Sequence, residues 1–249
     1  MYSLYVRHGY LDKSRPFIKN VNIREYDIKD CGFTILQKEK MLSKKEINYI
    51  DSLIKLDQNI FIGELSRTRP ELNDCINSNL ILIRQEFQEV NNIDDDYILS
   101  IKRDAIFVKE KLASQTKIQG VTFVEKNIYD CFLYLNEIEF YLQTSKSIIE
   151  TKGLGKNIEN DFLTDLKYLI SYANNKKLCI SKIKQYSRKY IKKQLPLGSY
   201  RELNNGNMFV VEKRNLVFYI NNYDSVDDLC INYNYMNYII PLFKVIIQS

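Results

Sequence analysis

The chain has 249 residues, with 36 Lys and Arg against 31 Asp and Glu, 45% hydrophobic residues, one His and no Trp. This apolar fraction with nearly balanced charge is typical of a folded protein and excludes a mainly disordered one. The sequence has no run of about 18 uncharged apolar residues and no signal-peptide pattern, so we expect an intracellular, cytoplasmic protein without a transmembrane segment. At this length one domain, residues 1–249, can bury a sufficient core.

The cysteines are widely scattered, and their spacing predicts neither a zinc site nor a redox pair. We expect buried thiols in a reducing compartment, because the number of cysteines is odd and their spacing is open. They are Cys31, Cys75, Cys131, Cys179 and Cys230. The many Ile, Lys, Asn and Tyr residues, which AT-rich codons encode, indicate a virus or another AT-rich genome.

The first predicted elements are a strand and a helix. Residues 2–6 form a short apolar run that ends at Arg7 and is typical of a strand followed by a loop. A helix is predicted over residues 44–56. Ser43 suits its N-cap, and Glu46 suits the third helical position of a capping box.

The next stretch combines an apolar run with a proline-initiated helix. Residues 59–62 are predicted to form a second buried strand, and residues 63–69 the loop after it. Pro70 suits the first position of a helix, on which three apolar residues form one stripe: Leu72, Ile76 and Leu80. This helix can continue to Val90, or it can end before a third strand over residues 80–83; we favour the second alternative.

The middle of the chain, residues 91–150, is interpreted as a cap or insertion. Within it, residues 97–108 and 121–124 have strand character, and residues 128–142 suit either a helix or a strand. A cap over a pocket would be the place where substrate choice resides.

In the last third, one helical stripe is formed by Ile158, Phe162, Leu166, Leu169 and Ala173. A strand over residues 177–181 and a helix over 183–193 follow, and residues 208–211 pair with 216–220 as a hairpin. Strands that alternate with helices at both ends of the chain predict an α/β protein. We expect a mainly parallel sheet with helices on both faces, that is, a three-layer αβα sandwich.

Ligands of an open α/β sheet bind beyond the carboxyl ends of its strands. Arg7 and His8 follow the first predicted strand, Arg67 and Arg69 follow the second, and Lys182 follows the strand over residues 177–181. Four cations and the only histidine of the chain are therefore expected at one crevice. Arginine binds phosphate oxygens with two N–H groups and imidazole can attack phosphorus, so this set predicts a phosphate site.

Three segments occur in the order found in one known family. Tyr5-Val-Arg-His-Gly9, Leu65-Ser-Arg-Thr68 and Leu178-Cys-Ile-Ser-Lys182 resemble motifs of the histidine phosphatase superfamily, the phosphoglycerate-mutase-like proteins. Asn204-Asn-Gly-Asn-Met-Phe-Val-Val211 is similar to the turn and strand that follow in that family.

The resemblance implies a phosphohistidine mechanism that needs no metal or other cofactor. His8 would become phosphorylated, while three cations would hold the phosphate: Arg7, Arg67 and Lys182. Glu86 or Glu89 would protonate the leaving group. Lys182 stands where the family has its second histidine. We therefore expect a protein that either hydrolyses a phosphorylated substrate or binds it without turnover.

A second signal is the basic stretch over residues 176–193, which holds eight Lys or Arg and no acid. The rest of the chain has 28 basic and 31 acidic residues, so this stretch sets the sign of the net charge. Two interpretations are open. The stretch is either the solvated face of an outer helix or a surface that binds polyanions. In the first case the helix would bury four side chains: Ile183, Tyr186, Tyr190 and Ile191. The alternative function is accordingly a non-catalytic scaffold or a viral nucleic-acid-binding protein that uses residues 184–193.

Overall fold

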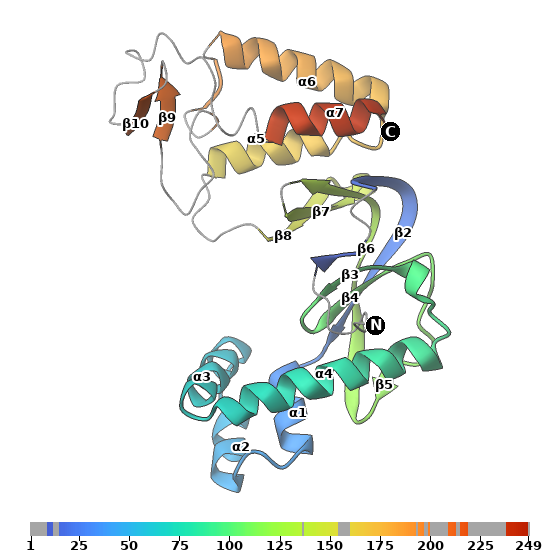
Figure 1. Cartoon of the computed structure of the whole chain (residues 1–249), viewed down its shortest axis with the longest axis vertical. Helices are drawn as coiled ribbons and strands as arrows, with labels where there is room; N and C mark the ends of the chain where they lie inside the picture. Colours follow the sequence, from blue (N-terminus) through green and yellow to red (C-terminus); the bar gives the residue numbers. More distant parts are fainter. Residues whose placement is uncertain are drawn as a thin grey trace. The chain divides into compact units, whose positions relative to one another are not determined.

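The computed structural model describes residues 9–11, 15–135, 137–153, 160–192, 194–196, 199, 209–212, 215–218 and 238–248. The chain forms two compact units (Figure 1). Unit 1 comprises Met1–Leu11 and Asn22–Ile128, and unit 2 comprises Asp12–Val21 and Tyr129–Ser249. The predicted strand over residues 2–6 lies outside the described residues.

In the part of the chain that the structure describes, the main sheet has eight strands in the order β1-β3-β4-β2-β6-β7-β8, with β5 paired to β6. Their bounds are β1 Gly9–Tyr10, β2 Phe17–Ile28, β3 Ile98–Lys102, β4 Ala105–Lys109, β5 Lys117–Ile118, β6 Val121–Leu135, β7 Ile138–Gln143 and β8 Ile148–Lys152. The sheet is antiparallel, so the prediction of a mainly parallel sheet between two helix layers is wrong. Several successive strands are joined by short turns, and only antiparallel strands can be joined so closely.

Residues 91–150, interpreted from the sequence as a cap or insertion, supply strands β3 to β7 and part of β8. Residues 128–142 were predicted to form either a helix or a strand. The structure shows strands here, the end of β6 and most of β7. The predicted C-terminal hairpin is confirmed as a separate two-stranded sheet, formed by β9 (Phe209–Glu212) and β10 (Asn215–Phe218).

The helices of unit 1 are α1 (Cys31–Lys38), α2 (Lys44–Asp51), α3 (Lys55–Thr68) and α4 (Pro70–Val90). The capping box at the start of α2 is confirmed. The Ser43 backbone N–H donates to Glu46 at 2.7 Å, and the Glu46 N–H donates to the Ser43 hydroxyl at 3.3 Å. The helix ends at Asp51, earlier than predicted, and a new helix begins at Lys55.

Two strand predictions in this region are wrong. Residues 59–62 and most of the predicted loop after them lie inside α3, and residues 80–83 lie inside α4, which continues to Val90. Pro70 does occupy the start of α4. The buried side chains of α4 recur every three or four positions along its whole length, so the polar residues 77–79 do not interrupt it: Leu72, Ile76, Leu80, Ile83 and Phe87.

These side chains pack into the core of unit 1, where α4 contacts α1 and α3 (Figure 1). Phe87 lies between two other aromatic rings. Its ring centroid is 4.1 Å from that of Phe123 in a stacked arrangement and 5.4 Å from that of Tyr26. Aromatic pairs of this geometry add to the free energy gained from area burial alone.

Unit 2 has its own core, formed by β7, parts of β2, β6 and β8, and three helices: α5 (Asn160–Ile170), α6 (Lys176–Ile191) and α7 (Ile240–Gln248). The predicted stripe is confirmed on α5 for Phe162, Leu166 and Leu169, which are fully buried. Ala173 is also fully buried but lies in the turn after α5, and Ile158 lies outside the described residues. Within the described part of the chain, no helix is both long and apolar enough to cross a membrane.

The strand predicted over residues 177–181 is wrong, because these residues lie in the first turns of α6. The side chain of Asn175 caps this helix by accepting the Leu178 N–H at 3.1 Å. The buried side chains of α6 recur at helical spacing: Cys179, Ile183, Tyr186 and Tyr190. Burial of the last three was predicted from the sequence. The side chain of Ile191 is outside the described part.

Candidate functional site

The outer face of α6 is a continuous basic surface. We define this basic surface by its seven described cations: Lys176, Lys177, Lys182, Lys184, Arg188, Lys189 and Lys192. All except Lys182 are exposed. α6 packs against α5 and α7 (Figure 1), and its buried apolar side chains face these helices, so the side that faces solvent is mostly charged.

These cations have no acidic partner among the described residues: no ion pair joins a side chain of the basic surface to a carboxylate. The first turn of α6 carries Lys176 and Lys177 and no acid. Positive charge at a helix N-terminus is unfavourable, since it opposes the positive end of the helix dipole. The surface therefore carries positive charge that no carboxylate side chain of the described residues neutralises.

Lys182 is the one cation of this surface with an aromatic environment. Its Nζ lies 5.6 Å from the ring centroid of Tyr168 and 5.4 Å from that of Tyr172. The contact with the Tyr168 hydroxyl raises the pKa of Lys182, and the same contact lowers the pKa of Tyr168. The ammonium group is thus held as a cation against two rings, of which Tyr168 is 44% exposed.

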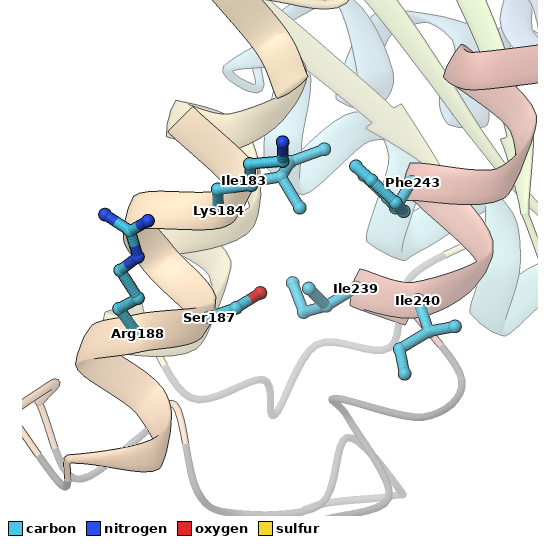
Figure 2. Close-up of a pocket in the computed structure, with 7 residues that line it drawn as sticks. All are labelled: Ile183, Lys184, Ser187, Arg188, Ile239, Ile240 and Phe243. Atoms are coloured by element: carbon cyan, nitrogen blue, oxygen red, sulfur yellow. The ribbon is translucent and has the colours of Figure 1, made fainter. Parts of the chain in front are cut away.

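On the other flank of α6, a groove of about 430 Å³ runs between α6 and the start of α7. Figure 2 shows Ile183 of α6 and Phe243 of α7 facing each other across it, while the Arg188 guanidinium extends away from α7. Lys184, Ser187, Ile239 and Ile240 complete the mostly apolar lining. The basic surface is therefore bordered by two tyrosines on one side and by an apolar groove on the other.

The charge of the chain is unevenly divided between the units. Unit 2 contains 19 Lys and Arg against 13 Asp and Glu, whereas unit 1 contains 17 against 18. The positive net charge of the protein therefore belongs to unit 2, which carries α6. A field of this kind speeds the association of an anionic partner.

The phosphate site predicted from strand ends stays a prediction, because part of it cannot be followed in the described structure. Arg7 and His8 lie outside the described residues. Arg67 is exposed in the last turn of α3, in unit 1, and Lys182 lies within α6, in unit 2. The expectation that Arg67 and Lys182 each follow a strand is wrong, because both segments are helical; a phosphate-binding role for them stays a prediction.

The predicted proton donors have structural partners. Glu86 accepts a hydrogen bond from Gln119 Nε2 at 2.6 Å, and Glu89 accepts one from Gln85 Nε2 at 3.0 Å, one turn away on α4. Whether either carboxyl group protonates a leaving group stays a prediction.

The aromatic border of the basic surface was missed in the sequence. Tyr168 and Tyr172 are four residues apart, a spacing that would place both on one side of a helix, although Tyr172 lies in the turn just after α5. Their ring centroids lie 5.1 Å apart, edge to face. This spacing was a usable signal, but only the packing of α5 on α6 brings the two rings to Lys182.

These features define the class of protein. It has two compact units, an antiparallel sheet and a basic helical surface. The chain belongs to the family of the bacteriophage PBS1 gene 130 protein, whose family model matches residues 1–248. Among curated proteins, none matches the chain. The expected viral origin is thereby confirmed, whereas the match gives no support to the resemblance to histidine phosphatases.

Proposed function

We propose that this phage protein binds nucleic acid through the basic surface of α6 and prefers single strands. The observation that carries the proposal is the set of cations on α6 without a carboxylate partner in the described structure. Unpaired lysines and arginines on a rigid helix neutralise phosphates and release counterions, which is the main source of affinity in non-specific nucleic-acid binding.

The spacing of the cations suits a phosphate backbone. Lys177, Lys184, Arg188 and Lys192 recur at intervals of seven, four and four residues and so form one stripe along the helix. At a rise of 1.5 Å per residue the stripe is about 22 Å long. It would contact several successive phosphates of one strand.

The preference for single strands follows from the tyrosines. An exposed ring can stack on an unpaired base, whereas the bases of a duplex stack on each other. Tyr168 is exposed beside Lys182, so a base that stacks on this ring would bring its own phosphate close to the ammonium group. No base-specific hydrogen bond is involved, and the binding should tolerate changes of sequence.

The test is fluorescence anisotropy with a labelled 20-nucleotide oligothymidylate and a 20-base-pair duplex, in NaCl from 50 to 300 mM. Lys184→Glu with Lys189→Glu removes two cations from the two flanks of α6. We expect at least a tenfold loss of affinity and a salt slope smaller by about two, because each lost phosphate contact lowers the slope by about one. Tyr168→Ala should weaken binding to the oligothymidylate more than binding to the duplex.

Lys44→Glu with Lys45→Glu is the matched control. It makes the same change of net charge at exposed positions of α2, in unit 1, where acidic residues suit the start of a helix. This variant should bind nearly as the unmodified protein does. Equal losses in the two double variants, or no salt-dependent binding by the unmodified protein, would refute the proposal.

The phosphohistidine reaction is a separate prediction, which rests on the resemblance of the sequence motifs alone. Turnover of an aryl phosphate that is inhibited by vanadate and abolished by His8→Ala would support it. A folded sample without turnover against a broad panel of phosphate esters would contradict it.

A further inference from the structure

Unit 1 contains a cavity that the proposed nucleic-acid binding does not use. Its volume is about 550 Å³, within the range of small-molecule sites. Residues from the end of β2, from α1, α3 and α4, from the turn between β3 and β4, and from β6 line it. All of these segments belong to unit 1.

The wall of the cavity is apolar at depth and polar at its rim. Ile62, Ile76 and Leu80 are buried side chains of α3 and α4, while Asn59 and Asn73 are exposed on the same two helices. A site of this kind can cover the flat body of a ligand and hydrogen-bond its edge.

Most of the carboxylates that line the cavity are already paired. Asp27 forms an ion pair with Lys126, and Asp30 forms one with Lys55 at 3.2 Å. Asp104 differs: within the described chain no side chain forms an ion pair with it or donates a hydrogen bond to it. Burial, followed by the nearby charge of Asp27, raises the pKa of Asp104 above its ordinary value.

The position of Asp104 is well defined. It belongs to the two-residue turn between β3 and β4, and its backbone carbonyl accepts the Ile28 N–H at 3.1 Å. The turn is thereby tied to β2, and the partly buried carboxylate is held at the cavity wall rather than on a long loop. A carboxylate on a backbone anchored in this way can accept two parallel N–H bonds at a smaller ordering cost than one on a flexible loop.

Gly63 keeps one side of the cavity open. It lies in the interior of α3, where glycine is less stable than alanine. A Cβ at this position would meet no atom within 4 Å, so packing does not require the missing side chain. Any larger residue would project into the space that Gly63 lines.

We propose that this cavity binds a small planar ligand that presents two adjacent N–H donors, as guanine and guanidinium groups do, to the Asp104 carboxylate. The two N–H groups of such an N–C–N unit match the two oxygens of a carboxylate, and both hydrogen bonds are charge-assisted. The apolar wall covers the body of the ligand, and the two asparagine amides are available to its polar edge.

The test is isothermal titration calorimetry of the full chain with guanosine and with L-argininamide, which distinguishes the two sources of this donor pair. Adenosine, which lacks the pair, is the ligand control. Asp104→Asn preserves the shape of the side chain but replaces one acceptor oxygen with a donor. Gly63→Phe narrows the part of the cavity beside α3, and Gly63→Ala is its matched control. Circular dichroism establishes that each variant is folded.

We expect guanosine or L-argininamide to bind and adenosine not to bind. Affinity should fall at least tenfold in Asp104→Asn and in Gly63→Phe and stay within about twofold in Gly63→Ala. The proposal is overturned if neither probe binds, or if a probe binds equally well to the protein and to folded Asp104→Asn. Lys184→Glu with Lys189→Glu should leave this binding unchanged, so the two proposals can fail independently.

Discussion

Arg69 connects three segments of unit 1 and provides a quantitative test of the structure. Its side chain lies at the junction of α3 and α4. Nη2 donates to the Met41 carbonyl at 2.6 Å, Nη1 to Glu46 Oε1 at 3.0 Å, and Nε to Glu71 Oε1 at 3.3 Å. In the sequence this residue was one of the four cations expected at the crevice, but it was not among the three expected to hold the phosphate. These contacts give it a structural role.

Replacing Arg69 with alanine should lower the free energy of unfolding by about 2 kcal/mol. The bond to the Met41 carbonyl is charge-assisted and contributes roughly half of this loss, after allowance for partial exposure of the arginine. The Glu46 pair contributes about 0.5–1 kcal/mol, because its carboxylate is 24% exposed. Glu71 is 56% exposed, and its pair should contribute almost nothing.

The effect should also depend on pH. The Ser43 backbone N–H and, to a smaller extent, Arg69 lower the pKa of Glu46 below its ordinary value of 4.5. The pKa of Glu46 is lower in the folded state than in the unfolded state, so ionised Glu46 stabilises the fold. This stabilisation is fully present above pH 4.5 and is lost as the pH falls through the folded-state pKa. Below that range, only the bond to Met41 distinguishes Arg69→Ala from the unmodified protein.

Urea unfolding followed by circular dichroism measures these differences, and a double-mutant cycle with Glu46→Gln isolates the coupling between the two side chains. Arg67→Ala is the matched control, since Arg67 is exposed two positions earlier in the last turn of α3; we expect a loss below about 0.5 kcal/mol. An Arg69→Ala variant as stable as this control, with no coupling to Glu46, would refute the reasoning.

Two further predictions concern the two cores. Phe87→Ala should destabilise unit 1 by about 3–5 kcal/mol, because it removes a ring stacked on Phe123; a urea-unfolding loss under 1 kcal/mol would contradict this packing. Cys131 and Cys179 are fully buried in unit 2, and burial raises the pKa of both thiols, that of Cys179 to about 12. Both should react with a maleimide only on unfolding, whereas the partly exposed Cys75 reacts earlier, as peptide mass spectrometry can establish; the reverse order would disprove this burial.

Local signals in the sequence predicted local structure correctly. The capping box at Ser43 and Glu46, the start of a helix at Pro70 and the hairpin of β9 and β10 all depend on neighbouring residues, and all are observed. Such signals succeed because the hydrogen bonds or steric restrictions behind them form within a few residues and need no distant partner.

Short apolar runs were assigned to the wrong element. Residues 59–62 and 177–181 were predicted as strands because four or five such residues suit a strand as well as a helix. The difference arises from long-range contacts: α6 gains stability when Cys179 and Ile183 pack together against the other helices of unit 2. The predicted direction of the sheet depended on these assignments and on the strand predicted over residues 80–83, so three false strands led to a parallel sheet that the described chain does not form.

The sequence alone established a folded, mildly basic chain with one exceptional stretch of positive charge, because charge and composition do not depend on folding. Only the tertiary structure showed that this stretch is the outer face of a helix and that Tyr168 and Tyr172 border it. The cavity beside Asp104 was equally invisible in the sequence. Its wall comes from six separate segments, and no periodicity within any one of them records which residues the fold brings together.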